Sequence, residues 1–116
     1  MIGAAAVAVA FSFARYGGNI VPFHATIFAN GKVLVNDRAH GTLTPAQLAA
    51  LRRVVAAQLF ASLPAHISCP AVLPDIATET VTAVSHGSRH SVTVRGGCNR
   101  RFDRVYAALT RAVGSP

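Results

Sequence analysis

Residues 43–48, Leu-Thr-Pro-Ala-Gln-Leu, decide the fold because together they specify the start of a helix. Thr44 suits the N-cap, where its hydroxyl can accept a hydrogen bond from a free backbone N–H. Pro45 follows at the first helical position, where its missing N–H costs nothing. Gln47 completes a capping box with Thr44, and the two leucines stand at the hydrophobic-staple positions. A helix is therefore predicted to begin at Pro45.

This helix is expected to be amphipathic and to end near Ser62. Arg52 and Arg53 lie off its apolar stripe. Pro64 disfavours the helical conformation at Leu63, which limits the length of the helix. The stripe has helical spacing and consists of Leu48, Leu51, Val54, Val55, Leu59 and Phe60.

A second helix is predicted from about Arg100 to Val113. Asn99 is a suitable N-cap, and Gly114 can end the helix in a left-handed conformation. Arginines occupy the side opposite to the apolar stripe, so we expect a buried inner face and a cationic outer face. The stripe follows helical spacing and consists of Phe102, Val105, Tyr106, Leu109 and Val113.

The sequence before the first helix predicts a strand and a hairpin. Large apolar residues alternate with small ones from Val7 to Phe13, which is typical of a strand with one buried face, and Gly17-Gly18 ends it. In residues 23–36, Asn30-Gly31 favours a two-residue type I′ turn. That turn would pair Phe28 with Val33 and leave both faces apolar near the turn.

A second hairpin is predicted over residues 78–95. Gly87-Ser88 suits a two-residue type II′ turn, which has glycine at its first central position. The implied register pairs Val81 with Val94 and Ala83 with Val92. The opposite face carries threonines and Arg95, so this hairpin should have one buried and one solvated face.

The 116 residues therefore form a single α+β domain, in the order β-ββ-α-ββ-α. We expect one antiparallel sheet of about five strands with both helices packed on one face. Hydrophobic residues make up 52% of the chain, enough for a core without a metal.

The apolar stretch from Met1 to Phe13 is too short to span a membrane. We interpret it as a strand, because no basic residue precedes it, as a secretion signal would require. A degenerate secretion signal is the alternative.

The two cysteines, Cys69 and Cys98, flank the second hairpin. The two ends of a hairpin lie close in space, so a disulfide between these residues is expected. Such a bond would favour a secreted or cell-envelope protein. The alternative is a pair of unpaired thiols in a cytoplasmic protein.

The charge is strongly positive, with 11 basic and four acidic residues and a net charge of +7. The second predicted helix concentrates this charge, and its candidate anion-binding residues are Arg100, Arg101, Arg104 and Arg111. A basic helix face can contact phosphates, so nucleic acid or an anionic surface is the alternative partner. No aromatic residues alternate with these arginines, as stacking platforms for single strands would require.

No cluster of residues indicates a catalytic centre, a metal site or a cofactor site. The four acidic residues are scattered, and the five histidines lack the spacing of a helical metal site. His86 and His90 are expected to be surface polar residues on opposite faces of the second hairpin. We therefore expect a protein that is not an enzyme and binds no cofactor or metal.

Several segments along most of the chain share a pattern with one protein family. They are Arg15-Tyr16-Gly17-Gly18, residues 27–33 (Ile-Phe-Ala-Asn-Gly-Lys-Val), residues 43–48, and residues 59–64 (Leu-Phe-Ala-Ser-Leu-Pro). In these segments the chain resembles the emfourin-type inhibitors of thermolysin-like metallopeptidases, which are small bacterial domains. It departs from them after the two glycines, where residues 19–23 replace a shorter turn.

The resemblance implies a protein-binding module, with a peptidase as the partner and inhibition as the activity. No functional residue is carried over from the family. The contact surface is expected to be the loop after the first strand or an exposed face of the sheet. The candidate residues of this loop are Gly17, Gly18, Asn19, Ile20, Val21 and Phe23.

Overall fold

The computed structural model describes residues 7–70 and 75–114, which form one sheet and two helices. In these residues seven strands follow the order β4-β3-β2-β1-β6-β7-β5, and all neighbours are antiparallel except β5 and β7. The elements are β1 Val9–Tyr16, β2 Phe23–Phe28, β3 Lys32–Val35, β4 Arg38–Thr42, α1 Pro45–Ala57, the 3₁₀ helix η1 Phe60–Ser62, β5 His66–Ser68, β6 Thr78–Ser85, β7 Ser88–Arg95 and α2 Arg100–Val113.

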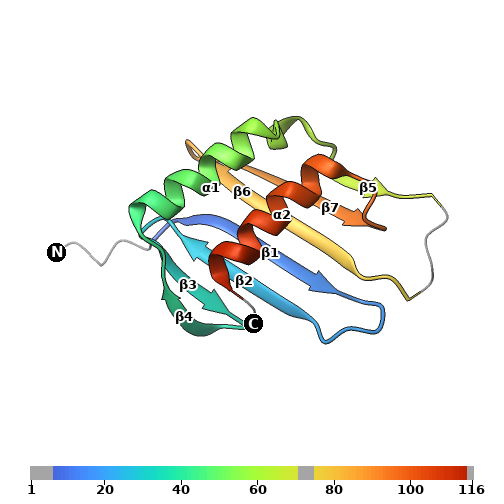
Figure 1. Cartoon of the computed structure of the whole chain (residues 1–116), viewed down its shortest axis with the longest axis horizontal. Helices are drawn as coiled ribbons and strands as arrows, with labels where there is room; N and C mark the ends of the chain where they lie inside the picture. The colour runs from blue at the N-terminus through green and yellow to red at the C-terminus, as the bar shows by residue number, and fades with distance from the viewer. Residues whose placement is uncertain (1–6, 71–74, 115–116) are drawn as a thin grey trace.

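Both helices lie on the same face of the sheet and pack against each other, and the opposite face is left open (Figure 1). The predicted α+β class and its two-layer arrangement are confirmed. The core lies between the sheet and the helices. Its fully buried large side chains are Phe11, Phe60, Phe102, Ile27, Leu109, Val81, Val92, Val94 and Val105.

Helix α1 begins as predicted and ends earlier than predicted. The Gln47 amide donates to Thr44 Oγ1 at 3.1 Å, and the Thr44 amide donates to Gln47 Oε1 at 2.8 Å, which completes the capping box. The helix stops at Ala57, because Leu59 takes the left-handed conformation, with φ 51°. Leu59 was expected in the buried stripe, but its position outside the helix leaves it 64% exposed.

A side chain from the other helix stabilises this early end. Arg101 donates from Nε to the Gln58 carbonyl at 2.7 Å, and from one terminal nitrogen to the Leu59 carbonyl and to Ser62 Oγ, both at 2.6 Å. The last carbonyls of a helix lack intrahelical partners. Arg101 satisfies them from α2 and thereby joins the ends of the two helices.

Helix α2 matches its predicted bounds. Asn99 Oδ1 accepts from the Phe102 amide at 2.9 Å, as an N-cap should. Gly114 follows the last helical residue with φ 83°, which an L side chain rarely adopts.

The first hairpin exists, but its predicted register is wrong by one residue. Ile27, and not Phe28, pairs with Val33. The loop has three residues, because the Gly31 amide bonds the Phe28 carbonyl at 2.9 Å and Gly31 is left-handed, with φ 92°. This is a type I turn followed by a glycine bulge. The one-residue shift moves Phe28 to the open face, so these strands are covered on one side only.

The second hairpin has the predicted faces with different partners. Val81 pairs with Val92, and the turn residues are His86 and Gly87, with φ 51° and 77°, which defines a type I′ turn. The expected type II′ turn at Gly87-Ser88 is therefore wrong. The observed register differs from the predicted register by two residues. Because side chains alternate between the two faces of a strand, every residue stays on the face of the sheet that was predicted for it.

Two short strands were not predicted and raise the count from about five to seven among the described residues. Asn36 and Asp37, with φ 49° and 66°, turn the chain so that β4 pairs with β3. All of β4 is exposed, so burial leaves no alternating pattern in its sequence. Strand β5 pairs in parallel with β7 and lies between Pro64 and Pro70, where the sequence has no strand pattern.

Cys69 and Cys98 form the expected disulfide, with their Cα atoms 5.7 Å apart. The Cys69 amide also donates to the Arg95 carbonyl at 3.0 Å, which extends the β5–β7 pairing to the cysteine. The disulfide thus ties the β5 side of the sheet to the start of α2. The described residues contain no free cysteine.

Candidate functional site

The loop between β1 and β2 projects from one end of the sheet and is anchored at its base. Gly18 has φ 58° and approaches the carbonyl of Asp75 so closely that an added Cβ would lie 2.1 Å from that oxygen. Asn19 Nδ2 donates to Asp75 Oδ2 at 3.3 Å. The loop and the segment that leads into β6 therefore hold each other in place.

The tip of this loop is an exposed apolar side chain. Val21 is 88% exposed, while Ile20 is partly covered. Phe23 differs from the other candidate residues because its ring packs edge-on against Phe13, with 6.0 Å between the ring centres. Phe23 anchors the loop to the core. Among the candidate residues with side chains, those left at the surface of the loop are therefore Asn19, Ile20 and Val21.

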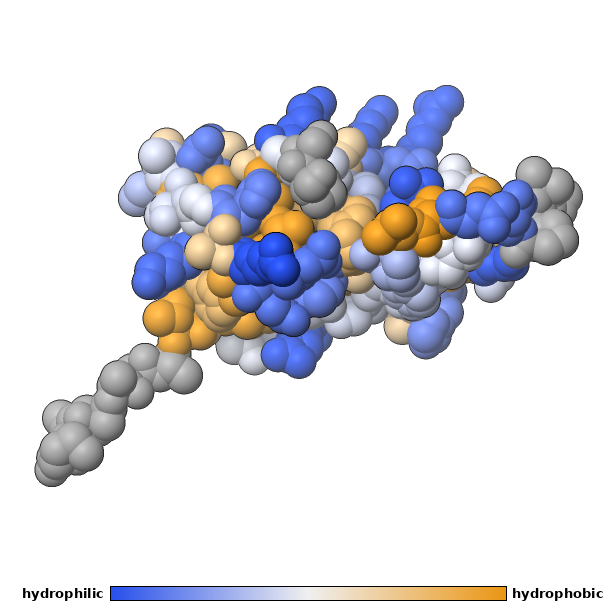
Figure 2. Space-filling model, turned by 90° about the horizontal axis from the view of Figure 1, so that it is seen from below, coloured by the Kyte–Doolittle hydropathy of each residue, from blue (hydrophilic) through white to orange (hydrophobic). Residues whose placement is uncertain are grey.

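The surface around the loop is mixed in polarity. On the face drawn in Figure 2, hydrophobic residues form separate patches between hydrophilic ones, and several long hydrophilic side chains stand out from the molecule. Large continuous apolar patches mark interaction sites or ligand-binding grooves. The hydrophobic residues on this face are instead divided into patches by hydrophilic ones.

Three of the four candidate arginines meet in a groove between α1 and α2. Arg100, Arg104 and Arg111 line a groove of about 550 Å³, together with Val54, Gln58, Asp103 and Ala107. All three arginine residues are exposed. Asp103 is the acidic residue in this groove and partly offsets its positive charge. The groove therefore presents a focused positive charge above a small apolar floor.

Arg101 does not belong to this groove, because its guanidinium is bound to the end of α1. The spacing of the four arginines along the helix also separates Arg101 from the other three. At about 100° per residue, Arg104 and Arg111 lie within about 40° of Arg100 around the helix, whereas Arg101 lies about 100° away. Arg101 thus lies apart from the other three candidate arginines, and its predicted part in anion binding stays a prediction.

A partly buried acidic cluster lies beneath the start of α2. Arg15 Nε lies 3.6 Å from Glu79 Oε2. Burial raises the pKa of the Glu79 carboxyl, the Arg15 charge lowers it, and the nearby Asp103 raises it further. Burial likewise raises the pKa of Asp103. Burial and the Glu79 charge raise the pKa of Tyr106 to about 12, and its hydroxyl has no partner among the described residues.

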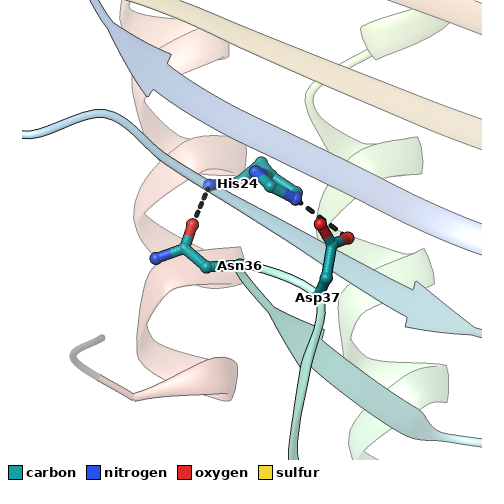
Figure 3. Close-up of polar contacts among 3 residues, drawn as sticks. All are labelled: His24, Asn36 and Asp37. Atoms are coloured by element: carbon teal, nitrogen blue, oxygen red, sulfur yellow. Dashed lines mark hydrogen bonds and ion pairs between the residues drawn. The ribbon is translucent and has the colours of Figure 1, made fainter.

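His24 and Asp37 form a polar contact on the open side of the sheet (Figure 3). His24 Nε2 lies 3.2 Å from Asp37 Oδ1, and the His24 amide donates to Asn36 Oδ1 at 3.0 Å. Both contacts fix the β3–β4 turn against β2. The imidazole and the carboxylate are exposed, so this pair is best explained as a surface clamp on the turn.

The expectation for the second hairpin's histidines is wrong in one respect. His86 lies in the turn and is exposed. His90 is half-buried, with Nε2 2.8 Å from the Leu63 carbonyl and its ring edge-on to Phe60. His90 therefore packs against the segment after α1, on the face of β7 that Val92 and Val94 share, and its partner across the strands is Ala83 and not Ser85.

The open face of the sheet carries small hydroxyl side chains. Thr80 and Thr93 lie 3.1 Å apart through their hydroxyls, and Thr82 and Ser91 lie 2.7 Å apart. Within residues 7–70 and 75–114, no group of three or more histidine, cysteine or acidic residues could hold a metal ion. None of the helices described there is long and apolar enough to cross a bilayer.

No family model, curated protein or solved structure matches this chain. The features that bear on function are therefore those of the molecule itself. They are the anchored loop between β1 and β2, the cationic groove between the helices, and the disulfide. A disulfide in a compact domain is consistent with a protein outside the cytoplasm.

Proposed function

We propose that this protein is a non-enzymatic binding module that inhibits a peptidase of the thermolysin-like metallopeptidase class, in a secreted or cell-envelope setting. The observation that carries the proposal is the loop tip, where Val21 is 88% exposed on a loop anchored at both ends. A loop that is already ordered loses less conformational entropy on binding, so more of its contact energy appears as affinity.

The chemistry of the loop also fits a peptidase cleft. Val21 offers an apolar side chain to a specificity pocket. Pro22 has no N–H to donate, so backbone hydrogen bonding between the loop and a strand of the cleft would stop directly after Val21. The resemblance of the flanking segments to emfourin-type inhibitors supports the same partner class, and the disulfide supports a setting in which secreted peptidases act.

The test is inhibition of a thermolysin-like metallopeptidase by the oxidised protein and two variants. Val21→Asp places a charge where the proposal puts an apolar contact, and it should weaken inhibition at least tenfold. Ala29→Asp is the matched control, because Ala29 is exposed in the turn at the other end of β2. Equal inhibition by both variants would move the contact surface away from the loop.

The second candidate function is binding of an anionic partner, and the groove between the helices favours it. Arg100, Arg104 and Arg111 could contact phosphates from one side of α2. Binding of a double-stranded oligonucleotide would then weaken with salt, with a slope of about −2.7 in log affinity against log salt for three phosphate contacts. Arg104→Gln should reduce the slope by about 0.9, and Arg89→Gln on β7 should not. A slope near zero would remove this candidate.

A further inference from the structure

An apolar pocket lies at the C-terminal end of α1, where the helix crosses the end of β6. Its volume is about 380 Å³, within the range of small-molecule sites. The last residues of β6 line the pocket, whereas the β1–β2 loop lies against the segment that leads into the start of that strand. The pocket and the loop therefore lie at opposite ends of β6. Its apolar walls include Phe11, Val55, Leu59, Phe60 and Ala83.

Arg52 is the charged residue among those that line this pocket. Its guanidinium carbon lies 5.6 Å from the centre of the Phe11 ring, and one terminal nitrogen donates to the Val84 carbonyl at 3.3 Å. A guanidinium has five N–H donors in a planar fork. The hydrogen bond to Val84 uses one of them and fixes the plane, which leaves donors for a carboxylate beside the apolar walls. Ser85 lines the same end of the pocket.

The opposite rim carries a constrained apolar side chain. Leu59 is 64% exposed and left-handed, a conformation that is unfavourable for an L residue. The bonds from Arg101 to the Gln58 and Leu59 carbonyls hold this conformation. A strained, exposed leucine that is fixed at a pocket mouth is a feature of binding sites more than of stable surfaces.

We propose that this pocket binds a free single-chain carboxylate of medium length, with its alkyl chain against the apolar walls and its carboxylate on Arg52. The charge of the pocket selects an anionic head over a cationic one. The volume suits one alkyl chain and not a two-chain lipid. This site is independent of the proposed inhibitory loop, so either can fail without the other.

The test compares decanoate, decanol and decyltrimethylammonium by calorimetry on the oxidised full chain. Decanoate should bind at least tenfold more tightly than decanol, and the ammonium compound most weakly. Affinity should rise about fourfold per methylene from octanoate to decanoate, since each buried CH₂ contributes a fixed free energy. Equal binding of decanoate and decanol, or no dependence on chain length, would overturn the proposal.

Variants identify the site. Arg52→Gln should remove the preference for decanoate over decanol, while Arg53→Gln, at the next and exposed position on α1, should keep it. Ala56→Phe should fill the pocket from the exposed rim of the helix and weaken both ligands at least tenfold. Unchanged decanoate affinity in Ala56→Phe, or equal losses in Arg52→Gln and Arg53→Gln, would place the ligand elsewhere and refute the assignment.

Discussion

Arg101→Ala should cost about 2–3 kcal/mol of the free energy of unfolding. Each hydrogen bond to a charged donor contributes about 1.5–3 kcal/mol. Arg101 makes three, but water can replace it at the exposed Leu59 carbonyl and at Ser62 Oγ. The bond to the part-buried Gln58 carbonyl should therefore supply most of the loss. Urea unfolding of the oxidised protein at neutral pH measures this quantity.

Arg100→Ala is the matched control, because it removes the same side chain from the preceding position of α2, where Arg100 is exposed. Its effect should stay within about 0.5 kcal/mol. Arg101→Lys should recover less than half of the loss, since an ammonium lacks the planar fork that reaches all three acceptors. Equal losses for Arg100→Ala and Arg101→Ala would refute the capping role.

Three further changes test other parts of the structure. Reduction of Cys69–Cys98 opens a loop with a sequence separation of 29, which should lower the free energy of unfolding by about 3–4 kcal/mol; an unchanged urea midpoint in reductant would contradict this. The raised pKa of Glu79 means that the folded state holds a proton that the unfolded chain has released. Stability should therefore fall as pH rises from about 4.5, the ordinary pKa of a glutamate, to the raised pKa, and Glu79→Gln should flatten this slope relative to the wild-type protein. Leu59→Gly should relieve the left-handed strain and raise the free energy of unfolding by about 0.5–1 kcal/mol, whereas a lower melting temperature would show that the side chain packs more than its exposure indicates.

Features encoded by local chemistry were predicted from the sequence. The start of α1 follows from Thr44, Pro45 and Gln47 alone, and both bounds of α2 follow from its own caps and stripe. The disulfide followed from the proximity of a hairpin's two ends. In each case the residues that decide the structure lie close together in the sequence or at the ends of one hairpin.

Features decided by distant contacts were missed. The end of α1 depends on Arg101, which lies 43 residues after Gln58, so no local sequence pattern predicts where the helix ends. The first hairpin's register depends on whether Asn30-Gly31 forms a two-residue or a three-residue loop, and both are compatible with the same residues. Strand β4 has no buried face, and strand β5 pairs only because β7 offers a free edge.

The positions of the candidate residues in the fold were predicted in outline, and their role in binding stays a prediction. The β1–β2 loop is where the sequence placed it, although Phe23 turned out to be an anchor. The sequence also located the cationic face of α2, but the structure places Arg101 outside the groove that the other three arginines line. The pocket at Arg52 had no sequence signal, because it forms only where α1, β1 and β6 meet.

The most direct test of the proposed function is a titration of a thermolysin-like metallopeptidase with the oxidised protein, in which residual peptidase activity is measured. The account predicts that activity falls to near zero at about one inhibitor per enzyme and that the 17–23 loop stays intact. Full activity at a large excess of the protein, or rapid cleavage within that loop, would contradict it.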